Sequence, residues 1–255
     1  MIFLRKNSPP SARSGPLKTR VLPTRSGVFS LYYRLTKPRM VDMNVLVAAA
    51  AFVFASHESF NWQEFGIMLL GLSFVVASAC VFNNYADRFL DAHMERTKNR
   101  ALATGKLNPT HALVFGSILF LCGFLLCLQL NLFALGAAMV GFVVYVFIYT
   151  PLKPKTGYAL YAGAVAGATP PVVGYTAAAH TLDYYALALF LILFLWQIPH
   201  FLAIARYRYD EYTAAGVPLL VTPPKSEEEK RRARKIFHYS LVLLLLVCLV
   251  LILQR

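Results

Sequence analysis

Long apolar stretches separated by short polar segments dominate the chain from residue 41 onward. Most of them approach the ~20 residues that cross a bilayer as a helix. Seven such stretches lie at residues 41–55, 65–82, 111–130, 132–149, 158–179, 184–205 and 237–253. Unpaired backbone groups are costly in lipid, and barrels need alternating patterns, so each stretch is expected to be a helix. The pattern predicts an all-α integral membrane protein with about seven spans.

Composition agrees with this pattern. Hydrophobic residues make up 58% of the 255 residues and charged residues only 15%, against ~45–50% and ~25% in soluble proteins. The apolar stretches are evenly spaced and no linker divides them. We therefore expect one transmembrane domain over residues 41–255.

The basic residues are distributed very unevenly along the chain. The polar segments 1–40, 83–110, 150–157 and 206–236 contain 24 of the 25 Lys and Arg residues, and the other interspan segments contain none. Membrane proteins keep such residues on the cytoplasmic side. The pattern therefore places the N-terminus and these segments on the cytoplasmic or matrix side. It also explains the net charge of +13 without a nucleic-acid partner.

The first 40 residues form a basic segment with nine Lys or Arg and no acidic residue. This composition is typical of a disordered basic tail next to a membrane. A mitochondrial transit peptide has a similar composition. The expected location is a bacterial plasma membrane, and the mitochondrial inner membrane stays open as the alternative.

The polar segment after the second span, NNYADRFLDAHMERTKNRALATGKL, carries the first candidate site. Asn83, Asp87 and Asp91 are spaced i, i+4, i+8, so on a helix they share one face. Mg²⁺ prefers one or two carboxylates together with phosphate oxygens of a substrate. The nearby cations Arg88, Arg96, Lys98 and Arg100 would bind further phosphate oxygens. The alternative is that the acids only solvate a loop and pair with neighbouring arginines.

A second acidic cluster follows the sixth span on the same predicted side of the membrane. In RYRYDEYTAAGVPLL, Asp210 and Glu211 stand beside Arg206 and Arg208. Two acidic clusters that face each other would hold a diphosphate through Mg²⁺. Because Mg²⁺ and arginine stabilise a departing diphosphate, the pattern favours an enzyme that transfers a lipid from its diphosphate. A dry aromatic cavity would protect the resulting carbocation from water.

Several motifs together resemble the UbiA superfamily of intramembrane prenyltransferases. They are the segment 83–107, LTKPR at 35–39, VVASACVFNNY at 75–85, GFVVYVFIYTPLKPKT at 141–156, GAVAGATPPVVGY at 163–175, LWQIPHFLAIA at 195–205 and DEYTAAGVPLL at 210–220. The resemblance covers about residues 31–222 and resumes in RARKIFHYSLVLLLLVCLVLIL. MERTKNR and WQIPHF are similar to the branch that modifies haem.

The resemblance implies a ring of transmembrane helices and a Mg²⁺-dependent farnesyl transfer. Farnesyl diphosphate would donate its farnesyl group to a vinyl carbon of haem B. The product would be haem O, which is used by terminal oxidases or converted onward to haem A. A terminal oxidase or a haem A synthase would therefore be a downstream partner.

The resemblance also implies roles for individual residues. The Mg²⁺–diphosphate ligands would be Asn83, Asp87 and Asp91, with Asp210 and Glu211 as the second acidic site. The phosphate-binding cations would be Arg88, Arg96 and Arg100, with Arg206 and Arg208 beside the second site. Lys153 and Lys155 would reach the diphosphate or a haem propionate. His200, in WQIPHF, would contact haem or protonate the vinyl group, unless it is simply a packed membrane histidine.

The chain departs from the family pattern in its number of spans. The family has nine and this chain has about seven, because VTPPKSEEEKRRARK joins the sixth span directly to a span that resembles the ninth. The loss of an even number keeps the sidedness of the last span. Three alternatives stay open: a UbiA-type enzyme acting on a quinone precursor, an inactive truncated variant serving as a membrane scaffold, and a transporter. Acidic residues at helix mouths rather than within spans favour an enzyme over a transporter.

Overall fold

The computed structural model describes residues 25–56 and 60–254, and in these ranges the chain forms helices and no strand. The long helices are α2 Pro38–Ala55, α3 Trp62–Ala86, α5 Pro109–Cys127, α10 Tyr184–Tyr207 and α12 Glu227–Leu253. The remaining elements are α1 Arg25–Leu35, α4 Arg88–Ala92, α6 Leu132–Val143, the π-helix η1 Val144–Tyr149, α7 Thr150–Leu152, α8 Ala159–Gly167, α9 Thr169–Ala179 and α11 Tyr209–Ala214. The all-α membrane fold is confirmed.

Six of the expected spans are continuous helices long and apolar enough to cross a membrane, with α6, η1 and α7 forming one of them. The expected span at 158–179 is instead two helices, α8 and α9, which meet at Ala168. Pro170 and Pro171 lack the N–H groups that would continue the hydrogen-bond ladder of α8, so the helix breaks just before them. The prediction of seven uninterrupted spans was wrong at this position.

The basic N-terminal segment contains more helix than its composition suggested. Residues 1–24 lie outside the described ranges. Residues 25–35 form α1, and α2 begins at Pro38, so the first span starts earlier than expected. The ring of Tyr32 on α1 lies edge-on to Phe115 on α5, with centroids 5.1 Å apart. These contacts attach α1 to the side of the bundle.

Polar side chains at the helix starts set where several spans begin. Asn61, Asn108, Asn131, Asp183 and Ser226 accept hydrogen bonds from the first free N–H groups of α3, α5, α6, α10 and α12. Such caps are worth ~1 kcal/mol each. They fix the residues at which the chain enters each apolar helix.

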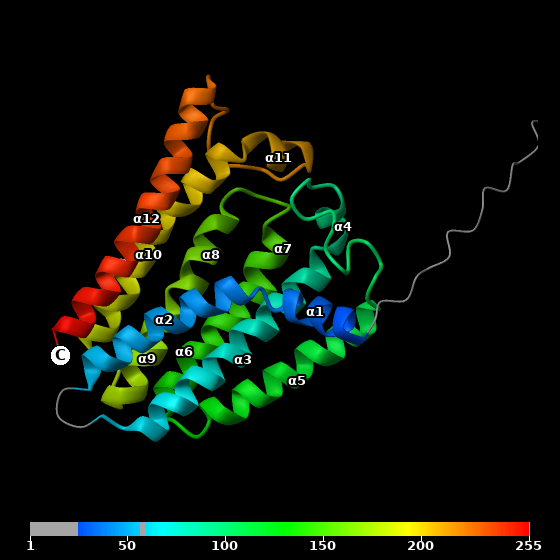
Figure 1. The fold of residues 1–255 in the computed structure, drawn as a ribbon. Coiled ribbons are helices and arrows are strands. Elements are labelled where there is room, and N and C mark those ends of the chain that lie inside the picture. The colour runs from blue at the N-terminus through cyan, green and yellow to red at the C-terminus, as the bar shows by residue number, and fades with distance from the viewer. Residues whose placement is uncertain (1–24, 57–59, 255) are drawn as a thin grey trace, which may run out of the picture.

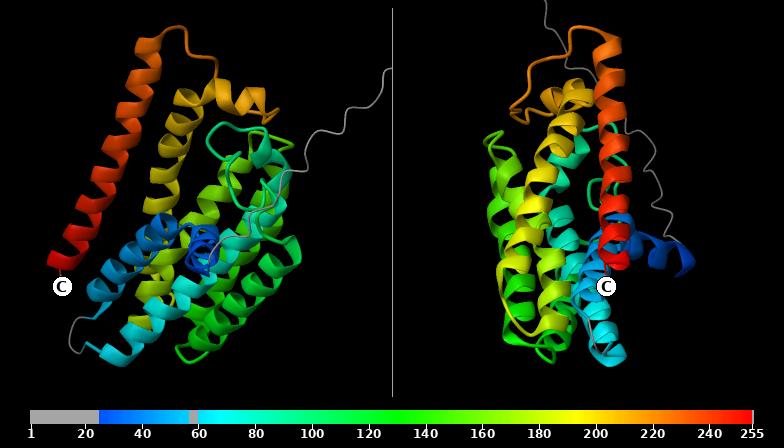
Figure 2. Two further views of the ribbon diagram at one scale, coloured as in Figure 1. Left: turned by 45° about the vertical axis from the view of Figure 1, so that its right-hand side comes forward. Right: turned by 90° about the vertical axis from the view of Figure 1, so that its left-hand side faces the viewer.

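The helices surround one internal cavity of about 350 Å³, which is lined by α2, α3, α6, η1, α8, α9, α10 and α12. Helix α5 packs outside this ring, against α3. Helix α12 lies against both α10 and α2, so it closes the ring although the chain has fewer spans than expected for the family (Figure 1). Figure 2 shows α12 running along the edge of the bundle toward the C-terminus.

One helix contact is unusually close. Gly174 on α9 packs onto the backbone of Ala48 on α2, and a Cβ atom at position 174 would lie only 1.9 Å from the carbonyl oxygen of Ala48. Small residues allow membrane helices to approach in this way. Here α9 lies at the end of the bundle opposite α11, and α4, α7 and α11 gather at the other end (Figure 1).

Candidate active site

The first predicted acidic cluster forms a buried site where α3 ends and α4 begins. Asn83, Asp87 and Asp91 are between 2% and 5% exposed. The N–H of Asp87 donates to the carbonyl of Asn83 (2.9 Å), and the N–H of Asp91 donates to that of Asp87 (2.7 Å). Helical hydrogen bonds therefore continue across the junction, so the expectation that these side chains share one face is confirmed.

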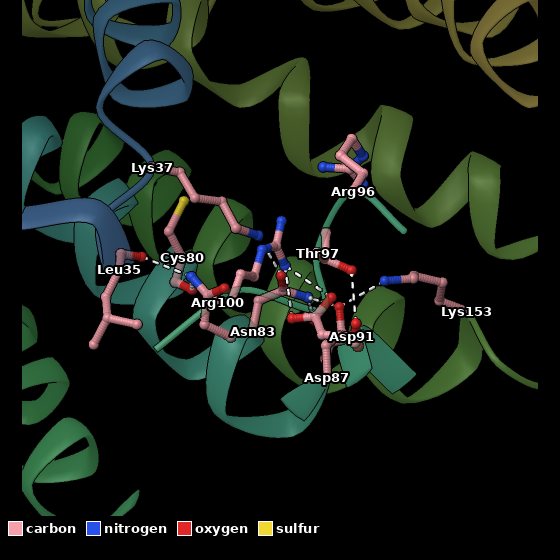
Figure 3. Close-up of polar contacts among 12 residues, drawn as sticks. Leu35, Lys37, Cys80, Asn83, Asp87, Asp91, Arg96, Thr97, Arg100 and Lys153 are labelled. Carbon is pink, nitrogen blue, oxygen red and sulfur yellow. Dashed lines mark hydrogen bonds and ion pairs between the residues drawn. The ribbon is translucent and has the colours of Figure 1, made fainter. Parts of the chain in front are cut away.

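Cationic side chains from distant segments meet this acidic face (Figure 3). Lys153 Nζ donates to Asp87 Oδ2 at 2.6 Å, and Arg100 Nη1 donates to both Asp91 oxygens at 2.9 and 2.7 Å. Breaking a buried pair by removing one partner typically costs ~3–5 kcal/mol, because the other charge is left without compensation. These pairs keep both carboxylates ionised and correctly placed.

Lys37 is a third cation at this site, and the sequence did not single it out. Its Nζ donates to Asn83 Oδ1 in a short contact. Lys37 has a left-handed backbone (φ 51°, ψ 65°) directly before Pro38, a conformation uncommon for residues other than glycine. Desolvation in this cluster is the main cause that lowers the pKa of Lys37 to about 8. The only sequence signal is its position in LTKPR, where α2 begins.

A hydrogen-bonded chain connects the site to the π-helix. Asn83 Nδ2 donates to Thr150 Oγ1 at 3.0 Å, and Thr150 Oγ1 donates to the carbonyl of Tyr145 at 2.8 Å. π-turns are rare and occur frequently at functional sites. In this case the wide turn holds Tyr145 and Tyr149 stacked, with ring centroids 5.2 Å apart, and both line the cavity.

The second acidic cluster lies at the same end of the bundle but is arranged differently. Glu211 Oε1 accepts from the backbone N–H of Arg96 at 3.2 Å, and Glu211 Oε2 pairs with Arg208 at 2.8 Å. Asp210 pairs with Lys230 at 2.8 Å, and its side chain is 74% exposed. Glu211 thus bridges to the loop after Asp91, whereas Asp210 faces α12. The ligand role of Asp210 stays a prediction.

Three of the other basic residues are placed away from the two carboxylates. Arg88 donates to the carbonyl of Tyr85 at 2.6 Å, and its guanidinium lies 4.3 Å from the ring centres of both Tyr85 and Phe89. Arg206 pairs with Glu229 at 2.9 Å. Lys155 is exposed. Their predicted contacts with substrate stay predictions.

The cavity begins beside this charged site and is mostly apolar. Met40, Cys80, Tyr145, Trp196 and Phe201 are among its lining residues. Cys80 lies one helical turn before the acidic face, and Met40 lies one turn after Lys37. A long apolar chain in the cavity would therefore have its polar head at the carboxylates.

His200, the other predicted catalytic residue, also lines this cavity. It is 8% exposed and stacks on Trp196, with ring centroids 4.9 Å apart. Its Nδ1 lies 2.7 Å from Ser240 Oγ on α12. The sequence did not indicate Ser240, because 40 residues separate it from His200.

The donor set of the first site fits a hard divalent cation. Asn83, Asp87 and Asp91 offer only oxygen ligands, the type that Mg²⁺ prefers. In the described ranges no three acidic, histidine or cysteine side chains gather as a complete metal site. The remaining ligands would thus have to come from a substrate, and phosphate oxygens suit both the ion and the surrounding cations.

Comparison with known protein families agrees with this geometry. Residues 44–254 match the model of the UbiA prenyltransferase family. The chain is 44% identical over 191 residues to the protoheme IX farnesyltransferase of Sodalis glossinidius, covering 74% of this chain and 64% of that protein. It is 42% identical over 194 residues to the protein of that name from Protochlamydia amoebophila, covering 76% and 69%. The chain thus spans roughly two thirds of the length of these relatives.

Solved structures show the same fold. A UbiA homologue from Archaeoglobus fulgidus bound to GPP and Mg²⁺ superposes with a TM-score of 0.67 at 17% identity, over 88% of this chain and 78% of that one. The apo structure of a UbiA homologue from Aeropyrum pernix gives a TM-score of 0.62, over 84% and 87%. The expected architecture of a helical ring is therefore confirmed.

Proposed function

Because the chain belongs to the UbiA prenyltransferase family, we propose that it transfers a farnesyl group from farnesyl diphosphate to a vinyl carbon of haem B, which gives haem O. The observation that carries this proposal is the buried face of Asn83, Asp87 and Asp91 at the entrance of an apolar cavity. The name of the similar proteins supports farnesyl and haem as the two substrates.

In this proposal the residues of the charged site bind the diphosphate. Asn83, Asp87 and Asp91 hold Mg²⁺, and the ion supplies positive charge that stabilises the departing diphosphate. Lys37, Lys153 and Arg100 stand within reach of the same ligand, as their contacts with the acidic face show (Figure 3). Arg100 has the donors to bind two phosphate oxygens at once, and the lysines act as point charges.

The cavity holds the farnesyl chain and keeps water from the allylic cation. Aromatic side chains such as Tyr145, Tyr149 and Trp196 line it. The C–O bond between farnesyl C1 and the diphosphate breaks, and C1 bonds to the terminal vinyl carbon. A water oxygen then bonds to the other vinyl carbon and releases a proton. This addition gives the hydroxyethylfarnesyl group.

We place the active site on the cytoplasmic or matrix side of the membrane. Helices α4, α7 and α11 lie at one end of the bundle (Figure 1), and the segments around them contain most of the described basic residues. A bacterial plasma membrane is our proposed location, with the mitochondrial inner membrane as the alternative. The product would pass to a terminal oxidase or to a haem A synthase.

Mass spectrometry on membranes that contain the chain tests the activity. With haem B, farnesyl diphosphate and Mg²⁺, we expect a product with the mass of haem O, and no such product from the Asp87→Asn variant. A prenylated aromatic acid formed from a quinone precursor instead would point to the other UbiA-type reaction. An inserted protein that modifies neither acceptor would fit a scaffold, and our proposal would then be wrong.

A further inference from the structure

The cavity contains one imidazole whose surroundings determine its tautomer. His200 Nδ1 lies 2.7 Å from Ser240 Oγ, and Ser240 Oγ itself donates to the carbonyl of Phe237 at 2.7 Å. A serine hydroxyl has one hydrogen to donate. Because that hydrogen is directed at Phe237, Ser240 must accept from His200. The proton of the neutral imidazole therefore resides on Nδ1.

The other ring nitrogen is then an unprotonated base. No described residue gives His200 Nε2 a hydrogen bond, and Nε2 is also absent from the sealed, unpartnered atoms of the described chain. His200 lines the cavity, so the lone pair of Nε2 is accessible from there.

The ring is also held firmly in one orientation. Trp196 stacks on it at an interplanar angle of 24°, and Phe237 lies on another side with its ring centroid 5.0 Å away. Trp196 Nε1 in turn donates to the carbonyl of Ser240 at 3.0 Å. A histidine whose second nitrogen donates to a fixed acceptor is the usual form of a metal-binding imidazole.

We infer that His200 Nε2 is an axial ligand of the haem iron when haem B occupies the cavity edge between α10 and α12. This inference rests on the proposed function, which makes haem B a substrate. Nε2 carries no proton in this tautomer, so the geometry favours iron ligation over protonation of the vinyl group. Ser240 is a positioning residue, because it acts through the imidazole.

Spectroscopy of the purified protein with ferrous haem B tests this inference without depending on turnover. The wild-type protein should show an iron–histidine stretching band by resonance Raman. His200→Ala should lose this band and regain it when imidazole is added, because imidazole can enter the vacated space. His238→Ala is the matched control, because His238 is exposed and donates or accepts only at the carbonyl of Arg234; it should keep the band. A band that persists in His200→Ala overturns the inference.

Affinity measurements provide a second test that does not need His200→Ala to fold. Ser240→Ala should bind haem B ~10–100-fold more weakly, the usual cost of losing such a supporting hydrogen bond. It should bind iron-free protoporphyrin IX as the wild type does. Ser73→Ala is the matched control, since Ser73 Oγ also donates within its own helix, to Leu69. Equal haem affinity in Ser240→Ala would contradict the inference.

The two proposals fail in different ways. Haem O production together with an unchanged Raman band in His200→Ala would remove the ligand assignment and leave the activity standing. An iron–histidine band that depends on His200, without any haem O from the wild type, would support the ligand and remove the activity.

Discussion

Replacing Gly174 with alanine should destabilise the whole helical ring. The new Cβ would lie 1.9 Å from the carbonyl oxygen of Ala48, whereas ordinary contacts begin at 3.4 Å. Helices α2 and α9 would have to separate by roughly 1.5 Å, and packed interiors do not absorb such shifts freely. Overpacking typically costs ~1–3 kcal/mol, and the upper end applies because the obstacle is backbone. For a chain of this size ~3 kcal/mol corresponds to a fall in Tm of about 6–12 °C.

Thermal unfolding in detergent, followed by circular dichroism, measures this effect. Gly136→Ala is the control, because a Cβ atom at this helical position meets nothing within 4 Å. Alanine favours a helix over glycine by up to ~1 kcal/mol, so the Tm of this variant should stay the same or rise. A Gly174→Ala variant as stable as the Gly136→Ala variant would refute the close contact between α2 and α9.

Three further predictions concern the charged site. Asp87→Asn and Asp91→Asn should each abolish turnover while the protein still inserts and elutes as the wild type does; Asp42→Asn, at an exposed position of α2, should stay active, and activity in both of the first two variants would contradict the ligand assignment. Lys37→Met should raise KM for the prenyl diphosphate ~10–100-fold, because a charge-assisted hydrogen bond contributes ~1.5–3 kcal/mol; an unchanged KM would exclude Lys37 from the site. Because Lys37 loses its charge as pH rises through about 8, affinity for a diphosphate analogue should fall over that range in the wild type and persist to higher pH in Lys37→Arg, and identical titration profiles would contradict the pKa of Lys37.

The part of the site that the sequence predicted is local. The spacing of Asn83, Asp87 and Asp91 specifies a shared face wherever the backbone is helical, and hydrogen bonds carry that helix across the end of α3. The spans followed from apolar length for a similar reason. Only the span containing Pro170 and Pro171 was misjudged, because its mean apolarity concealed the two residues that break it.

The rest of the site depends on tertiary contacts that no spacing reveals. Lys37 reaches Asn83 across 46 residues, and Lys153 reaches Asp87 across 66. Adjacent acids also diverged, because Glu211 pairs with Arg208 while Asp210 pairs with Lys230. Sequence identifies such groups as candidates, but which of them meet is decided by helix packing and by the left-handed turn before α2.

The π-helix η1 gives one span an unusual tolerance to changes in length. A residue deleted between Val144 and Tyr149 can be absorbed if the wide turn tightens to an ordinary α-turn, so Lys153 would remain beside Asp87. The same deletion earlier in α6, where the turns are already tight, would rotate everything after it by about 100° and take Lys153 away from its partner. Evolution can therefore insert or remove a residue in this turn without re-aiming the segment that follows.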